Sequence, residues 1–471
     1  MIENIELIVL FVWLILFVII VGATYKVHHQ IKAFKAEAKE EKAEILQNTQ
    51  NFLYALVVFI CISSIGVLYL FLKGTIYESH FFEWLNLTVR LIHITFGIAW
   101  IGASFYFVFL ENALNRIDNV RDELAGNLWA VHGGGFYYLE KYKVAPKQMP
   151  KHLHWFKYEA YFTWLSGFSL LSVVYYFNAK SYLIDPEVLD IEPLQAIAIS
   201  ISSLIVGWVI YDQICKRITT SKVVFTIAIT LLTILFAWFY AQVFSGRAAY
   251  IHFGAFLGTL MAGNVFFVII PGQKRMVNAA KKGLQPNPAD GKAAMLRSYT
   301  NNYFTLPVLF VMISNHFPST FGNQYQWLIL LGITLGTAGV KHYLNLREKG
   351  ELSVWVMPIS VIILLGMAFI TAPEKPKYEN CTEIVSFTEI QSIIHNRCIV
   401  CHSANPTDAV WKVAPNGVKY DTPDQIYNLK DKIFQRAVVS KNMPFNNNQT
   451  GMTQEERDMI NCWITQGAPK E

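Results

Sequence analysis

Long apolar runs recur through most of this chain, and they limit its fold more than any other feature. Ten runs approach the roughly 20 residues that a helix needs to cross a bilayer. They lie at about 6–25, 51–72, 84–110, 155–178, 192–214, 221–243, 248–272, 303–316, 326–344 and 353–372. A backbone inside lipid must satisfy its own hydrogen bonds. The sequence therefore predicts an all-α, polytopic membrane domain of about ten helices.

The scarcity of charge supports a membrane protein. Charged residues make up 15% of the chain, whereas soluble domains carry about 25%. The net charge of +5 is concentrated in particular loops. This distribution indicates an orientation signal and argues against a nucleic-acid partner.

The basic loops alternate along the chain. Loops after odd-numbered runs hold many lysines and arginines, as in 26–42 and 274–297, whereas loops after even-numbered runs hold almost none. The positive-inside rule places the basic loops in the cytoplasm. We therefore expect a multi-pass protein of the bacterial cytoplasmic membrane with both termini outside. The first apolar run is too long for a cleaved signal peptide and is expected to remain as a helix.

The long apolar runs end at Ala372 and a stretch of mixed polarity follows, which predicts a second domain. We expect an extra N-terminal helix and charged tail at 1–50, the main membrane domain at 51–372 and a linker at 373–380. A small, class I-like cytochrome c domain is expected at 381–471. Two helices are expected there, near Phe387–Asn396 and Thr453–Gln466, the second opened by a Thr453–Glu456 capping box.

The motif Cys398-Ile399-Val400-Cys401-His402 predicts covalent attachment of haem c. Two thiols bond the haem vinyl groups, and His402 then reaches the iron. A zinc site or a redox dithiol is the alternative, although no further zinc ligands at suitable spacing are evident.

Met443 is the expected second axial ligand of this haem iron, with Met452 as its competitor. A methionine ligand raises the haem potential, which suits an electron acceptor. Cys381 and Cys462 flank the domain in the same oxidising compartment. They are expected to form a disulfide, the alternative being two free thiols.

Two histidines within apolar runs have matched expected depth in the outer half of the membrane, His93 and His252. Ionisable residues inside a membrane are candidates for function. The pair could ligate the iron of a b-type haem, or each could be a hydrogen-bonded interior histidine.

A polar group is expected on the inner side. It comprises His132 before Gly133-Gly134-Gly135, Glu159 beside Lys157, and Arg297 with Asn301 and Asn302. Glycines let a backbone approach a ligand closely. Arginine and asparagine offer the planar donors and acceptors that a flat heterocycle requires.

Several strings of the sequence together resemble the membrane-bound, cytochrome c-linked urate oxidases over roughly residues 82–471. The strings are Trp84–Leu87, Gly97–Phe107, Trp129–Tyr137, His154–Tyr161, Thr163–Gly167, Gly246–Ala249, Asn264–Gln273, Asn301–Tyr303 through Leu306–Val308, Met443-Pro444 and Trp463-Ile464. Thr300 stands where many relatives have His, so no catalytic role is carried to that position. The chain up to about Asn51 lies outside the resemblance.

The resemblance implies an oxidoreductase of purine catabolism that converts urate and water to 5-hydroxyisourate. Electrons would leave singly through the haem to an external cytochrome c and the respiratory chain, without oxygen. Urate is expected among Arg297, Asn301, Asn302 and the His132 loop, with His132 or Glu159 accepting protons.

Other readings stay open. Urate could instead bind in the outer half, near His252, His316 and Arg247. An inner site would leave most of the roughly 30 Å hydrocarbon core between urate and haem c, which would call for the second haem. The whole chain could also be a quinol-to-cytochrome electron conduit, or a transporter with a haem sensor.

Overall fold

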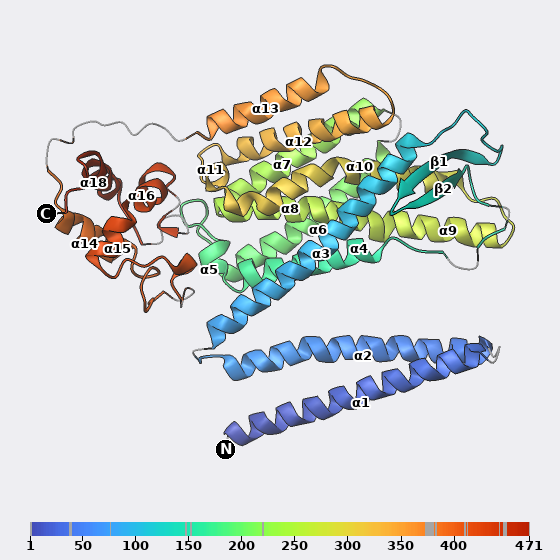
Figure 1. Ribbon diagram of the computed structural model, residues 1–471, viewed down its shortest axis with the longest axis horizontal. Helices are drawn as coiled ribbons and strands as arrows, with labels where there is room; N and C mark the ends of the chain where they lie inside the picture. The colour runs from blue at the N-terminus through green and yellow to red at the C-terminus, as the bar shows by residue number, and fades with distance from the viewer. Residues whose placement is uncertain are drawn as a thin grey trace. The chain divides into compact units, whose positions relative to one another are not determined.

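The computed structural model describes all residues except 1, 37–39, 76, 147, 151–152, 219–220, 373–380, 382–383, 409–410, 412, 442, 446–449 and 471. The chain forms two compact units, Met1–Leu85 and Asn86–Glu471. In the first unit, α1 (Ile2–Ala36) and α2 (Glu40–Leu72) pack against each other, and α3 (Glu78–Ala113) begins there (Figure 1). The predicted linker, 373–380, lies outside the described residues.

Helices make up most of the second unit (Figure 1). After α3 and a two-stranded hairpin come α4 (Tyr158–Leu171), the π-helical turn η1 (Ser172–Tyr176), α5 (Ala179–Tyr182), α6 (Pro193–Arg217), α7 (Lys222–Val243), α8 (Gly246–Gly263), the π-helical turn η2 (Asn264–Ile269), α9 (Ile270–Lys281), α10 (Pro288–Ile313), the 3₁₀ turn η3 (Ser314–His316), α11 (Pro318–Phe321), α12 (Gln326–Glu348) and α13 (Val356–Ile370).

The expected count of ten membrane helices needs correction. Among the described residues, six helices are long and apolar enough to cross a membrane: Thr49–Leu72, His80–Ala113, Pro193–Arg217, Lys222–Val243, Gly246–Lys281 and Gln326–Glu348. The predicted run at 6–25 lies within α1. The predicted runs at 155–178, 303–316 and 353–372 are also helical, but their helices are shorter, interrupted or more polar than a membrane-crossing helix. Helix α13 has 15 residues, α4 ends in a π-helical turn, and α10 carries the polar residues around Arg297. Six such helices are compatible with a multi-pass membrane protein.

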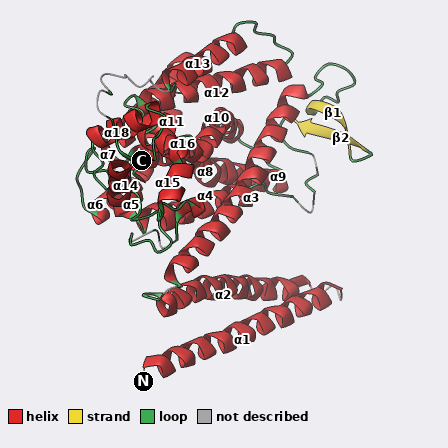
Figure 2. Ribbon diagram, turned by 60° about the vertical axis from the view of Figure 1, so that its left-hand side comes forward, coloured by secondary structure: helices red, strands yellow, loops and turns green. Residues whose placement is uncertain are grey.

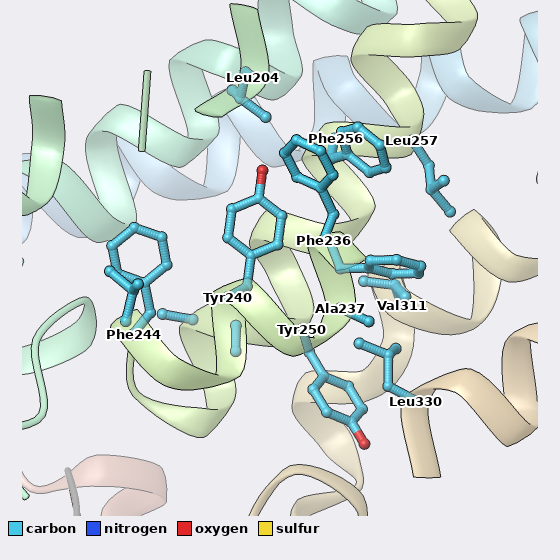
Figure 3. Close-up of a cluster of buried hydrophobic side chains, with 14 of the residues drawn as sticks. Leu204, Phe236, Ala237, Tyr240, Phe244, Tyr250, Phe256, Leu257, Val311 and Leu330 are labelled. Atoms are coloured by element: carbon cyan, nitrogen blue, oxygen red, sulfur yellow. The ribbon is translucent and has the colours of Figure 1, made fainter. Parts of the chain in front are cut away.

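Most side chains of helix α8 are buried in one large hydrophobic cluster, part of which Figure 3 shows. Its Phe256 ring stacks on Phe236 of α7 with a centroid distance of 4.2 Å. Gly207 of α6 permits this approach, because a Cβ at that position would lie 2.6 Å from the Phe256 ring. Small residues thus let α6 and α7 close on α8, as is common between membrane helices.

A β-hairpin corrects the all-α prediction. Strands β1 (Leu124–His132) and β2 (Gly135–Tyr142) pair antiparallel between the predicted runs at 84–110 and 155–178 (Figure 2). Gly133 and Gly134 form the two-residue turn with φ of +58° and +80°. Positive φ at both central positions is the requirement of a type I′ hairpin turn. These two glycines therefore close a hairpin that the α-helical interpretation overlooked.

The C-terminal region, residues 381–471, has its own hydrophobic cluster around Ile390, Ile460 and Trp463. Its elements are α14 (Phe387–Arg397), η4 (Pro415–Gly417), α15 (Pro423–Asn428), α16 (Lys430–Ile433), η5 (Phe434–Val439) and α18 (Gln454–Thr465). Both predicted helices are confirmed as α14 and α18. The predicted Thr453–Glu456 capping box is also confirmed, and Cys381 and Cys462 are disulfide-bonded.

Candidate functional site

Arg297 lies on α10 with 3% of its side chain exposed, and it is paired. Its Nη2 donates to Asp212 Oδ1 of α6 at 2.6 Å, and Nη1 donates to Asn264 Oδ1 of η2 at 3.1 Å. Asp212 also pairs with Lys216 one helical turn further on, at 2.6 Å. The charge of Arg297 therefore already has a counter-ion inside the protein.

Asn264 joins the remaining members of this group. Its Nδ2 donates to Tyr211 Oη at 2.8 Å and to Asn301 Oδ1 at 2.7 Å. Asn301 Nδ2 in turn donates to the Met261 carbonyl at 3.1 Å. We call Tyr211, Asp212, Asn264, Arg297 and Asn301 the Arg297 cluster. Asn264 opens the π-helical turn η2, an irregularity that is frequent at functional sites.

Asn302 points to a different neighbour. It is fully buried, and its Nδ2 donates to Asn345 Oδ1 of α12 at 3.0 Å. Its own Oδ1 is buried without a hydrogen-bond partner in the described structure. Nearby in sequence on α12, the buried Lys341 places Nζ 4.1 Å from the centroid of the Phe105 ring.

The sequence interpretation missed Asp212, although a signal was present. An acidic residue inside an otherwise apolar run is costly in a membrane and points to a partner. The identity of that partner required the fold, because Asp212 and Arg297 are far apart in sequence.

His132 and Glu159 stand apart from the Arg297 cluster. His132 is exposed at the end of β1. In the described part of the chain, no hydrogen bond or ion pair links it to Arg297, Asn301 or Asn302. Glu159 is in the first turn of α4, and its Oε2 is buried without a hydrogen-bond partner among the described residues.

The two membrane histidines have different surroundings. His93 Nδ1 contacts the Thr163 carbonyl at 3.0 Å. A carbonyl can only accept, so Nδ1 carries the proton and Nε2 is the potential ligand atom. His252 is fully buried, with Nδ1 bonded to the Ala248 carbonyl and Nε2 to Ser200 Oγ, both at 2.8 Å. Iron ligation through Nε2 of His252 would replace the hydrogen bond between this nitrogen and Ser200.

The residues of the Cys398–His402 motif fit haem c. Neither Cys398 nor Cys401 is in a disulfide, so both thiols remain available. His402 Nδ1 contacts the Val418 carbonyl at 3.0 Å. This contact fixes the proton on Nδ1 and leaves Nε2 as the ligand atom, the usual arrangement of a metal-binding histidine. Within the described residues, no group of three or more His, Cys, Asp and Glu side chains is placed to hold a metal ion.

Burial is the main cause of the shifted pKa values of the two thiols in this motif. It raises the pKa of Cys398 to about 12, with a further rise from Cys401. It raises the pKa of Cys401 to about 11, with Asp408 adding to the effect. Burial also lowers the pKa of His402, against the opposing effect of its hydrogen bond with the Val418 carbonyl.

The segment that carries Met443 is held by a buried arginine. Arg457 of α18 donates through Nη1 to the Met443 carbonyl at 2.9 Å and also to the Ala437 carbonyl. The competing residue, Met452, is 3% exposed and packs in the hydrophobic cluster of the C-terminal region. Met443 is only partly buried, which suits the prediction that it is the axial ligand.

Comparison with known proteins gives one family. The family model described as "Urate oxidase N-terminal" matches residues 79–372. No curated protein and no solved structure matches the chain. The matched range includes the Arg297 cluster, Glu159 and both membrane histidines.

Proposed function

The chain belongs to the urate oxidase N-terminal family, and on this premise we propose that it is a membrane-bound urate oxidase that passes electrons to a c-type cytochrome. The family match supports urate-related oxidation. The Cys398–His402 motif, with its free thiols and its oriented histidine, is the observation that supports electron transfer through haem c.

The proposed reaction balances without oxygen. The urate monoanion and one water give 5-hydroxyisourate, one proton and two electrons. A C–O bond forms between the water oxygen and C5 of urate. The water gives up one proton and keeps the other in the new hydroxyl group. The two electrons leave one at a time to a ferric c-type cytochrome, which is the oxidant. No peroxide is formed.

Haem c would be held by Cys398, Cys401 and His402, with Met443 as second ligand. When bound, this group would supply a one-electron acceptor. The protein supplies the Val418 carbonyl that orients His402 and the Arg457 guanidinium that holds the Met443 segment. Raised haem potential from a methionine ligand would favour electron flow away from urate.

Glu159 is the proposed proton acceptor, with His132 as the alternative from the sequence. The unpaired Oε2 of Glu159 supports this choice. The exposed position of His132 on the hairpin gives it less support. Catalytic roles for Arg297, Asn301 and Asn302 stay predictions, as does iron ligation by His93 and His252.

The location of the C-terminal region is proposed to be the outer face of the bacterial cytoplasmic membrane. The alternation of basic loops supports this orientation. The Cys381–Cys462 disulfide supports it independently, because disulfides persist in oxidising compartments.

The first test is an anaerobic optical spectrum of the purified holoenzyme before and after addition of urate. We expect reduction of the haem by urate and not by xanthine, which has the same ring system without the third carbonyl. With excess ferric cytochrome c, two cytochromes should be reduced per urate consumed. Labelled water should deliver its oxygen to the product.

Two results would replace this proposal. Reduction by a quinol and not by urate would make the chain an electron conduit. Movement of urate across vesicles without haem turnover would make it a transporter with an appended haem. A spectrum of the His93→Ala variant tests the second haem: the loss of a b-type absorbance would support ligation, and an unchanged spectrum would exclude it.

A further inference from the structure

Arg247, the second residue of α8, has surroundings unlike those of Arg297. Its Nε donates to Asn315 Oδ1 at 3.0 Å. Its guanidinium carbon lies 5.3 Å from the centroid of the Tyr182 ring and 5.7 Å from that of Phe445. Among the described residues, no carboxylate lies within ion-pair distance of Arg247. Its Nη groups thus have no anionic partner there.

A second arginine adds positive charge at the same place. Arg90 of α3 is close enough to Arg247 for the two like charges to oppose each other. Arg90 donates to Asn86 Oδ1 at 3.1 Å, and no carboxylate pairs with it in the described part of the chain. Two like charges that act on each other and have no counter-ion favour a bound anion.

A buried tyrosine hydroxyl faces this pair. Tyr175 of η1 is 3% exposed, yet its hydroxyl has no hydrogen bond of normal geometry in the described structure. The hydroxyl lies beside the Arg247 and Asn315 side chains. A buried hydroxyl without a full hydrogen bond has a free-energy cost. A bound ligand that accepts from Tyr175 would remove that cost.

The same place adjoins the C-terminal region. Tyr182 of α5 packs against Phe445 and Trp411, with ring centroids 5.3 and 6.5 Å apart. Burial raises the pKa of Tyr182 to about 12, against the lowering effect of Arg247, and Asp408 and Cys401 are close enough to contribute to the rise. Phe445 follows Met443 by two residues, and Cys401 is one of the haem-attachment thiols.

Two other candidate places in the second unit lack these properties. The Arg297 cluster is neutralised by Asp212, and its amide donors are used internally. A groove of about 290 Å³ near His154 and Gln273 is lined mainly by apolar side chains such as Leu153 and Met276, with no lysine or arginine among its described lining residues. Neither place offers an unpaired cation to a urate anion.

We propose that the urate anion binds at the outer arginine site, formed by Arg90, Tyr175, Arg247 and Asn315, directly beside the C-terminal region. This inference rests on the proposed urate oxidation and gives it a location. All four residues lie within the family match. They come from α3, η1, the start of α8 and η3.

The chemistry of urate suits this group. Urate is a flat anion edged by alternating carbonyl oxygens and ring nitrogens. An arginine fork can donate two parallel hydrogen bonds to such an edge. Asn315 supplies both a donor and an acceptor, and the Tyr175 hydroxyl supplies a further donor. Tyr182 can bound the site as an aromatic wall toward Phe445.

This location also removes the need for an intermediate redox centre. An inner substrate would have to send electrons across most of a hydrocarbon core about 30 Å thick. At the outer arginine site, Tyr182 lies between the proposed substrate and the region that carries Cys401. Both ring nitrogens of His252 already have hydrogen-bond partners. This agrees with an electron path that does not pass through His252.

The test measures binding apart from turnover. Radiolabelled urate is equilibrated with full-length holoenzyme whose haem has been reduced chemically, so that oxidation cannot proceed. Arg247→Gln and Arg90→Gln should each weaken urate binding about tenfold or more, because each removes a charge-assisted contact. Arg275→Gln is the matched control, since Arg275 is exposed and paired with Asp290. It should leave the affinity unchanged.

A further variant separates a loss of urate binding from misfolding of the arginine variants. Asn315→Asp places a carboxylate beside Arg247, so it should keep the fold and still abolish urate binding by occupying that charge. An unaltered haem spectrum reports a folded holoenzyme. Tyr175→Phe should weaken binding severalfold.

The outcomes separate the two proposals. Wild-type binding that persists in Arg247→Gln, Arg90→Gln and Asn315→Asp would overturn the outer arginine site and leave the urate oxidase proposal standing. Loss of binding in Arg297→Gln alone would move urate to the Arg297 cluster. No urate binding by the wild-type holoenzyme would overturn both proposals.

Discussion

The Arg297–Asp212 pair allows a sharp test of whether the Arg297 cluster is part of the folded framework. Replacing Asp212 by Asn leaves the Arg297 cation without a counter-ion at a position that is 3% exposed. Breaking a buried ion pair in this way costs about 3–5 kcal/mol, since a charge is left uncompensated. We expect Asp212→Asn to lower the free energy of unfolding by about 4 kcal/mol.

The reverse replacement should cost less. In Arg297→Met the charge is removed, and Asp212, 13% exposed, keeps its ion pair with Lys216. The remaining losses are the hydrogen bond to Asn264 and part of the Coulomb attraction. Lost hydrogen bonds of this kind cost about 1–3 kcal/mol, so we expect a loss of about 2 kcal/mol.

The assay is reversible unfolding in mixed detergent micelles, with Lys216→Gln as control. Lys216 is 62% exposed, so this control should cost less than about 1 kcal/mol. The double variant Asp212→Asn with Arg297→Met should recover part of the loss in Asp212→Asn, because no charge remains buried. If Asp212→Asn were no more destabilising than Lys216→Gln, the structural account of the pair would be refuted.

Three further predictions concern the C-terminal region and the hairpin. In haem-free full-length protein at pH 8, alkylation should be on the order of a hundredfold slower for Cys401 and on the order of a thousandfold slower for Cys398 than for an unperturbed thiol, because their raised pKa values of about 11 and 12 leave little thiolate. Rates close to those of free cysteine, read by mass spectrometry, would contradict this. Arg457→Gln should weaken the far-red absorption band of methionine-ligated ferric haem, since it releases the Met443 carbonyl; an intact band would show that another residue holds the ligand. Gly134→Val should destabilise the hairpin by about 1–2 kcal/mol, because Gly134 has a φ of +80°. The control Gly135→Ala lies outside the positive-φ turn and should cost less. Rates of proteolysis at the hairpin tip would compare the two variants.

The elements that the sequence predicted correctly are those defined by a local sequence pattern. The run of apolar residues at 221–243 predicted α7 because length and hydropathy suffice to define a membrane helix. The Thr453–Glu456 spacing predicted the start of α18 because both capping bonds are local. The β-hairpin was missed although Gly133-Gly134, flanked by β-branched and aromatic residues, carried its signal.

The sequence by itself determined the elements whose physical cause is local: the apolar helices, the helix caps and the spacing of Cys398, Cys401 and His402. The tertiary structure alone decided which polar groups meet. Only the fold pairs Asp212 with Arg297 while leaving Arg247 without a carboxylate partner among the described residues, and only the fold brings Tyr175 beside Asn315. These residues come from separate helices and turns that are far apart in the sequence. Periodicity within one helix carries no information about the residue that will face it from another.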